Sequence, residues 1–315
     1  MENQTSPDST PAFDQNLVNR IAWEAIAEQR RARRWGIFFK LLFMFYIIIL
    51  TFMYYPSDLT SGPLVGKKHT ALVDIEGVIA ADTEANADHV IGGLRAAFEN
   101  KNTAGVILRI NSPGGSPVQA GYINDEIRRL RTLHPDIPLY AVITDICASG
   151  GYYIAVAADK IYANKASVVG SIGVIMEGFG FVDTIKKLGI ERRLMHAGEN
   201  KGFLDPFSPL RPDEVAHAEK LLQQIYRQFI DTVKAGRGKR LQQDDKMFSG
   251  LVWTGEESVQ LGLVDGLGSA SSVAREVIGA EDIVDYTLHE TYLDKFARKI
   301  GTAVAGTLSE KFQLR

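Results

Sequence analysis

The strongest constraint on this chain is an apolar segment near its N-terminus. Residues 35–55 carry a single charge, Lys40, close to the start of the run. As a helix the segment is about 31 Å long, which matches the ~30 Å hydrocarbon core of a bilayer. A core helix of a soluble protein would show a polar face, whereas residues 41–55 contain only Thr51 as a polar interruption. We therefore predict a transmembrane helix over 35–55.

The charges flanking this segment predict its orientation. The next basic residue after the segment is Lys67. Four arginines precede the segment within a few residues: Arg30, Arg31, Arg33 and Arg34. The positive-inside rule places the N-terminus in the cytoplasm and everything after Tyr55 outside. A cleavable signal peptide is the alternative, but the preceding segment is long and no small-x-small cleavage site follows. An uncleaved anchor is the prediction.

The rest of the chain divides by composition. Residues 1–34 form a cytoplasmic segment, containing either a short amphipathic helix on the inner leaflet or the solvated start of the anchor helix. Residues 56–69, with Ser, Gly and Pro, are typical of a linker. The interval 70–280 is predicted to be the catalytic domain, and 281–315 a C-terminal tail.

From residue 70 onward, β-branched runs alternate with amphipathic segments. Hydrophobic residues make up 45% of the chain and charged residues 23%, with a net charge of −3, which is an ordinary globular balance and gives no case for nucleic-acid binding. The alternation predicts an α/β fold with a largely parallel sheet. The strands are expected at 71–79, 105–110, 138–146, 160–163, 168–175 and near Leu194, and the helices at 84–100, 118–133, 151–158 and 212–234.

Several common catalytic signatures are missing from the sequence. It contains no G-x-S-x-G, no G-x-x-x-x-G-K-[ST], no H-E-x-x-H and no G-x-G-x-x-G. None of the six histidines has metal-ligand spacing with another, and His134 and His196 are the only ones considered for catalysis. The one cysteine, Cys147, is interpreted as a small hydrophobe in a packed strand. No metal or cofactor is expected.

Ser149 is the leading candidate nucleophile. It follows an apolar strand and precedes two glycines and a helix, so that its hydroxyl lies at the carboxyl edge of the sheet. The amide of Gly150 is unobstructed and suits an oxyanion hole. The alternative is that Ser149 is only a helix N-cap. A second glycine turn at 111–116 follows another strand and offers further bare amides.

A serine nucleophile needs a base, and no histidine is convincing. Lys201 stands in a loop whose flanking Phe and Leu residues can exclude water. Composition alone does not separate it from Lys186, Lys187 or Lys220.

Taken together, these motifs resemble the signal peptide peptidase A (protease IV) family, which has the Clp-protease/crotonase fold of repeated β-β-α units. The matching stretches are RINSPGGS at 109–116, ASGGYY at 148–153, AADK at 157–160, GSIGV at 170–174, Lys201 with Asp205 and Pro206, VWTG at 252–255 and GLVD at 262–265.

The resemblance implies a Ser–Lys dyad of Ser149 and Lys201, an oxyanion hole of Gly114 and Gly150, and a role for Ser171 in orienting the lysine. It implies a serine endopeptidase in a bacterial cell (inner) membrane, with its catalytic domain on the outer side. The expected substrates are released signal peptides and other apolar peptides, and the expected partners are the lipid bilayer and further copies in a homo-oligomeric ring. A crotonase-like acyl-CoA enzyme and a catalytically silent scaffold are the alternatives.

Overall fold

The computed structural model describes residues 15–54, 66–242 and 244–289. Contacts divide the chain into two units, residues 1–65 and residues 66–315. The described residues of the first unit form one helix, α1 (Gln15–Tyr54). The helix runs without a break through residues 15–34 into the apolar segment, which agrees with their interpretation as the start of the anchor helix rather than a separate helix. Tyr55, the last residue of the predicted span, lies outside the described residues.

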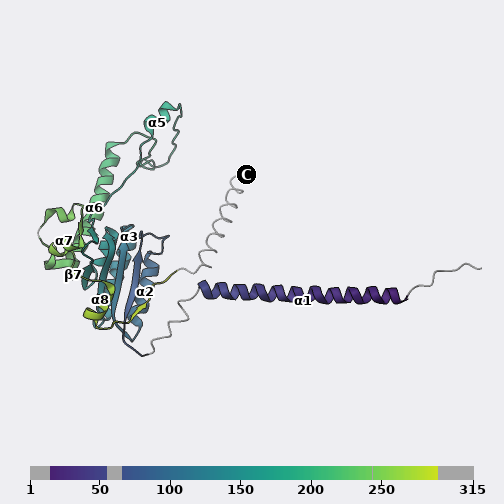
Figure 1. The fold of residues 1–315 in the computed structure, drawn as a ribbon. Helices are drawn as coiled ribbons and strands as arrows, with labels where there is room; N and C mark the ends of the chain where they lie inside the picture. The colour runs from purple at the N-terminus through teal and green to yellow at the C-terminus, as the bar shows by residue number, and fades with distance from the viewer. Residues whose placement is uncertain (1–14, 55–65, 243, 290–315) are drawn as a thin grey trace, which may run out of the picture. The chain divides into compact units, whose positions relative to one another are not determined.

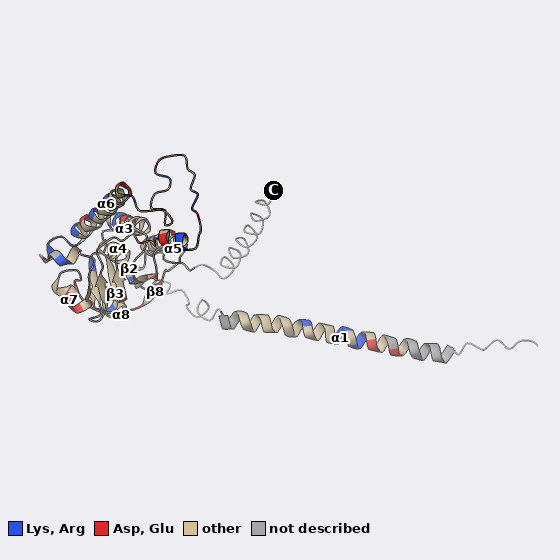
Figure 2. Ribbon diagram, turned by 90° about the horizontal axis from the view of Figure 1, so that it is seen from above, with Lys and Arg blue, Asp and Glu red and all other residues tan. Residues whose placement is uncertain are grey.

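The composition of α1 divides along its length. The stretch Ile26–Thr51 is long and apolar enough to cross a membrane, with a mean hydropathy of 1.7 in its most apolar window and no burial against the protein. Charged residues gather in the N-terminal half of the helix, and the C-terminal half is apolar apart from Lys40 (Figure 2). This distribution fits a membrane anchor.

The second unit is built on one mixed, mostly parallel sheet of eight strands, in the order β6-β5-β3-β2-β1-β8, with β4 pairing with both β3 and β7. Only the β5–β6 pair is antiparallel. The α/β prediction with a largely parallel sheet is therefore confirmed. The strands are β1 (His69–Glu76), β2 (Thr103–Ser112), β3 (Leu139–Ala148), β4 (Lys160–Ala163), β5 (Val168–Gly170), β6 (Val252–Thr254), β7 (Gly266–Leu267) and β8 (Ile283–Asp285).

Helices cover both faces of this sheet (Figure 1). The larger core lies between the sheet and α2, α3 and α4, and a smaller cluster, Leu72, Ile107, Val142, Val273 and Ala274, lies under the C-terminal helical turns. The helical elements are α2 (Ala87–Glu99), α3 (Pro117–Leu133), α4 (Gly150–Ala155), α5 (Val182–Lys187), α6 (Pro212–Arg237), η1 (Gly238–Arg240), η2 (Asp245–Phe248), α7 (Gly255–Gln260), α8 (Ala270–Ser272) and η3 (Val273–Ile278).

Two sequence predictions differ from the structure. No strand forms near Leu194, because residues 191–196 lie in an exposed loop with no neighbouring strand to pair with. Residues 168–175 form only the short β5, because Ser171 takes a positive φ of 51° that ends the strand. In addition, β8 pairs with β1, so the sheet continues past residue 280 into the segment predicted to be a tail. The remaining residues of that tail, 290–315, lie outside the described residues.

The long helix α6 is fixed to the sheet at its C-terminal end. Arg237 is buried, donates to the carboxylate of Asp265 at 2.6 Å and to the carbonyl of Gly262 at 2.9 Å, while Asp265 also accepts from the amide of Ile161. From this attachment α6 leads back to an arm, residues 176–211, which includes α5 and lies beyond the N-terminal end of α6, away from the sheet (Figure 1).

Candidate active site

Ser149 lies at the junction of β3 and α4 in a strained conformation. Its φ of 50° and ψ of −120° are unusual for a residue with a side chain. The amide donates to the carbonyl of Gly170 at 2.9 Å, and the Ser149 carbonyl accepts from the amide of Tyr153 at 2.9 Å. The hydroxyl makes no capping hydrogen bond to α4. The N-cap interpretation therefore does not describe this side chain, which is left available for chemistry.

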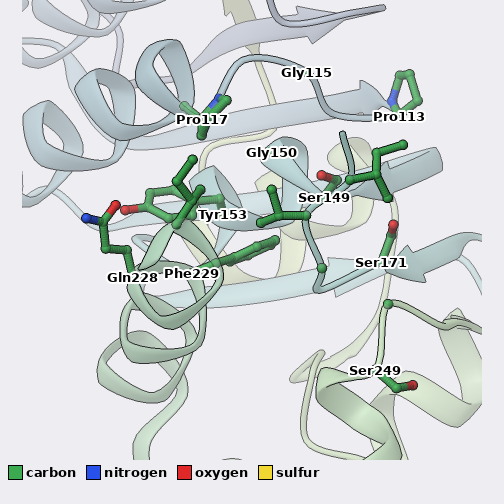
Figure 3. A pocket seen from close by; sticks show the side chains of 16 residues that line it. Pro113, Gly115, Pro117, Ser149, Gly150, Tyr153, Ser171, Gln228, Phe229 and Ser249 are labelled. Carbon is green, nitrogen blue, oxygen red and sulfur yellow. The ribbon is translucent and has the colours of Figure 1, made fainter. Parts of the chain in front are cut away.

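The hydroxyl faces a cavity of about 570 Å³ at the carboxyl end of the central strands (Figure 3). Its walls are two glycine-rich turns, the segment between β5 and the arm, the middle of α6 and the loop before β6. No lining residue carries a charge: Pro113, Gly115, Pro117, Ala120, Ser149, Gly150, Tyr153, Ser171, Gly173, Val174, Ile175, Ile225, Gln228, Phe229, Ser249 and Gly250. A cavity with this lining suits an uncharged segment of substrate.

Residue 114, in the turn after β2, is a glycine because the backbone there lies very close to Ser149 and Gly150. A Cβ on Gly114 would lie 2.7 Å from both the amide nitrogen of Gly150 and the Cβ of Ser149, so any larger residue would displace the nucleophile. The amide of Gly114 donates to the hydroxyl of Ser112 at 3.1 Å. Gly114 is thus in contact with Ser149, but its N–H already has a partner.

The next glycine has the free amide. Gly115 lines the cavity, as does Gly150. Within the described part of the chain, neither amide donates to a protein acceptor. The nitrogen of Gly115 is 3.3 Å from the position that a Cβ of Gly150 would take, so the two backbone segments are adjacent. Two free N–H groups therefore lie close to the candidate nucleophile, as an oxyanion hole requires.

Ser171 lies on the neighbouring strand end and projects into the same cavity as Ser149 (Figure 3). Its φ is 51°, and its amide donates to the carbonyl of Leu251 at 2.7 Å. The ring of Trp253 packs against Gly170, where a Cβ would lie 2.8 Å from the ring carbons. The β5–β6 pairing thereby fixes both Ser171 and the carbonyl that holds Ser149.

Lys201 is exposed in the arm and does not line the cavity. The turn that carries it packs on the first turns of α6, where Phe203 contacts the ring of His217 edge-on at 5.6 Å. Eleven residues separate His217 from Gln228 in the cavity wall, or about 17 Å along the helix. The structure thus does not bring Lys201 to Ser149 within one chain.

The other candidates lie apart from the cavity. His196 is exposed in the arm, and His134 packs on Phe98 beside the amino ends of the strands. Cys147 is fully buried, and burial raises the pKa of its thiol well above its usual range. Among the described residues, no group of three His, Cys, Asp or Glu side chains is placed to hold a metal ion.

Sequence reasoning missed the α6 wall of the cavity. The ring of Tyr153 lies 5.3 Å from that of Phe229, and its hydroxyl accepts from Thr232 at 3.0 Å. Ile225 and Phe229 share one face of α6, four residues apart, which is a signal present in the sequence. The sequence does not show which part of the molecule this face covers, because α6 is distant from β3 along the chain.

Comparison with known proteins gives a family match. Residues 131–282 match the model of Peptidase family S49. The chain is 29% identical to the putative signal peptide peptidase SppA of Enterococcus faecium, over 71% of this chain and 67% of that protein. It is 34% identical to the putative protease slr0021 of Synechocystis, over 64% of this chain and 71% of that protein.

A third relative has a different name. The Na(+)/H(+) antiporter NhaA of Brucella abortus is 44% identical over 188 residues, which cover 60% of this chain and 25% of that protein. The chain thus spans about a quarter of the length of this relative. A match of that extent carries no transport activity to this chain.

Proposed function

The chain belongs to peptidase family S49, and we propose that it is a membrane-anchored serine endopeptidase that hydrolyses apolar peptides with a Ser149–Lys201 dyad. The environment of Ser149 is the main observation that supports this proposal. Its hydroxyl is uncapped, its backbone is strained, and two free glycine amides lie beside it in an uncharged cavity. Acyl transfer by a serine needs this combination of nucleophile and oxyanion donors.

We assign the oxyanion hole to the amides of Gly150 and Gly115. Gly150 is the donor expected from the sequence. The turn after β2 was expected to contribute Gly114, but that amide donates to Ser112, whereas the amide of Gly115 is free and lines the cavity. One oxyanion donor is typically worth about 2.7–4 kcal/mol of transition-state stabilisation. Gly114 then serves by allowing the backbone to approach Ser149.

In the proposed reaction, Lys201 acts from a neighbouring chain. The Ser149 hydroxyl attacks the substrate carbonyl and transfers its proton to the neutral amine of that lysine, while the oxyanion binds the two glycine amides. The lysine returns the proton to the leaving amine, which leaves an ester on Ser149. Water then attacks the ester, again with the lysine as base, and frees the serine and a carboxylic acid product. Ser171, in the same cavity wall, orients the lysine amine.

The arm supports action between chains. It carries several apolar side chains that are largely exposed, among them Phe179 at 82%, Leu188 at 67% and Met195 at 93%. Such a surface needs a covering partner. A second copy of the chain would cover it and bring Lys201 to a neighbouring Ser149, as in the predicted ring, and α1 would favour assembly by confining the chains to one membrane.

The cavity and the anchor together define the proposed substrates. An uncharged lining with Tyr153, Ile225 and Phe229 favours apolar residues near the scissile bond. Enzymes anchored in a membrane meet released signal peptides and other membrane-derived peptides at its surface. We place the catalytic unit on the outer side of a bacterial cell membrane from the arginines that precede the apolar segment. Family S49 membership favours a peptide substrate over the acyl-CoA alternative.

Digestion of a synthetic signal peptide by the full chain in proteoliposomes tests the proposal. Ser149→Ala and Lys201→Ala should each lose nearly all activity, and Lys201→Arg should fail as well because a guanidinium stays protonated. Ser271→Ala, which changes an exposed serine on α8, is the matched control. Full hydrolysis by Ser149→Ala would overturn the proposal.

Co-expression tests the assignment of Lys201 to a neighbouring chain. Mixed oligomers of Ser149→Ala and Lys201→Ala chains should recover part of the activity, because some neighbours rebuild an intact dyad. Verified mixed oligomers without activity would mean that each chain completes its own site.

A further inference from the structure

Backbone hydrogen bonds within the turn that carries Lys201 hold only part of it. The amide of Lys201 donates to the carbonyl of Gly198 at 3.1 Å, and the amide of Asp205 donates to that of Gly202 at 3.1 Å. Between them Leu204 takes a φ of 52°, a conformation that a branched side chain disfavours. Such a residue persists only where its surroundings fix it.

Glu214 supplies that fixation. Its side chain is 7% exposed, and its Oε2 accepts the amide of Leu204 at 3.2 Å. The nearest cation is Arg211, at 3.6 Å from Oε1, one turn earlier. Asp213 and Glu214 both lie in the first turn of α6, where the helix dipole favours a negative charge, but only the second of them is buried. The interaction that distinguishes Glu214 is therefore its bond to the strained turn.

The position of Glu214 connects the turn with the cavity. It lies in the first turn of α6, and eleven residues later the same helix contributes Ile225 to the wall opposite Ser149. The C-terminal end of α6 is fixed to the sheet through Arg237 and Asp265. Because α6 is fixed to the sheet at its C-terminal end, this helix determines the position of the turn that carries Lys201.

A second carboxylate holds the far side of the turn. The side chain of Asp205 is 9% exposed, accepts from the hydroxyl of Ser208 at 2.6 Å, and meets Arg192 at 3.4 Å. The Ser208 hydroxyl, together with Arg192, lowers the pKa of Asp205. This group fixes the exit of the turn to the arm itself, whereas the Glu214 carboxylate bonds the turn to α6 beside the ring contact of Phe203 with His217.

We propose that Glu214 is a positioning residue for catalysis, which holds the Lys201 turn on α6 through the amide of Leu204. The inference rests on the proposed role of Lys201 as base. Because a misplacement of about 1 Å in a reacting group can cost about 100-fold in rate, loss of this bond should lower kcat while leaving substrate binding nearly unchanged.

Three variants of the full chain test this inference in proteoliposomes. Glu214→Ala should lower kcat roughly 10- to 100-fold with KM within about twofold. Glu214→Gln keeps a carbonyl oxygen that accepts the Leu204 amide, and should recover most of kcat. Asp213→Ala, the neighbouring exposed carboxylate, is the control and should match wild type. A Glu214→Ala enzyme with the kcat of the control, or a Gln variant as impaired as the Ala variant, would overturn the inference.

Mixed oligomers separate positioning from a general effect on the fold. Glu214→Ala is placed either on the Ser149→Ala chain, which donates the lysine, or on the Lys201→Ala chain, which donates the serine. Recovered activity should fall only in the first arrangement, and equal loss in both would contradict a positioning role. If the parent pair recovers no activity, action between chains fails, and the kcat comparison of the single-chain variants still decides the role of Glu214.

Discussion

The amide of Ser149 donates to the carbonyl of Gly170 at 2.9 Å, and this bond joins the candidate nucleophile to the strand that bears Ser171. Gly170 has a φ of 117°, and the ring of Trp253 occupies the space where its side chain would be. Gly170 needs both its positive φ and its lack of a side chain, because β5 ends there and the chain continues into the cavity wall.

Replacing Gly170 should therefore damage catalysis. In Gly170→Ala the new Cβ would meet Trp253 at 2.8 Å in a disfavoured backbone region, with a strain of about 1–3 kcal/mol. We expect kcat to fall roughly 10- to 100-fold as Ser149 shifts. Gly121→Ala is the control, since nothing lies within 4 Å of its Cβ in α3. Equal peptide hydrolysis by the two variants would show that this bond does not position the serine.

The only cysteine should be chemically silent in the folded protein. Cys147 is 0% exposed, and burial raises the pKa of its thiol, which disfavours the reactive thiolate. Alkylation with a maleimide should occur only after denaturation, and Cys147→Ala should retain activity. Rapid labelling of the native protein together with inactivation would contradict this and make the thiol a competing nucleophile.

The ion-pair cluster between α2 and α3 predicts an acid-sensitive component of stability. Hydrogen bonds from Arg129 and Arg95 lower the pKa of Glu126 to about 2, from an ordinary value of 4.5. Because the folded pKa is the lower one, this stabilisation is complete above pH 4.5 and is lost as the pH falls toward 2.

Glu126→Gln should remove that component. Both arginines are about half exposed, so we expect it to be about 1–2 kcal/mol at neutral pH, below the ~3 kcal/mol that the full shift would give. Urea denaturation of the full chain in detergent at pH 7 and pH 3 measures it. The difference between variant and wild type at pH 3 should be reduced to roughly 40% of its value at pH 7, and a difference independent of pH would refute the assignment.

Topology is tested with reporter fusions. Four arginines precede the apolar segment, so a reporter enzyme fused at residue 60 should be active only outside the cytoplasm. A fusion at residue 34 should give the opposite result. Cytoplasmic activity of the first fusion would invert the orientation and remove the basis for placing peptide cleavage at the outer surface.

Local patterns were enough to predict the α/β sheet and the place of Ser149. Strand β2 contains a continuous β-branched run, α3 has a helical pattern of apolar residues, and Gly150 follows the serine directly. Shorter elements such as β7 and β8 contain too few residues for a period, and they form only because β4 and β1 offer them an edge.

The rest of the site depends on three-dimensional arrangement. Which amide of the Gly114–Gly115 pair is free depends on the hydroxyl of Ser112, which captures the first of them. The separation of Lys201 from the cavity depends on the length of α6. A strand near Leu194 does not form because no neighbouring strand satisfies its backbone, which local sequence does not reveal.

Covalent labelling of the full chain tests whether Ser149 is the nucleophile. The full chain is incubated with a fluorophosphonate, which reacts with activated serines, and the modified residue is identified by mass spectrometry of proteolytic fragments. We predict modification of Ser149 in step with the loss of peptide hydrolysis, and no modification in Ser149→Ala. Modification of a different residue that accompanies inactivation, with hydrolysis retained in Ser149→Ala, would show that Ser149 is not the nucleophile.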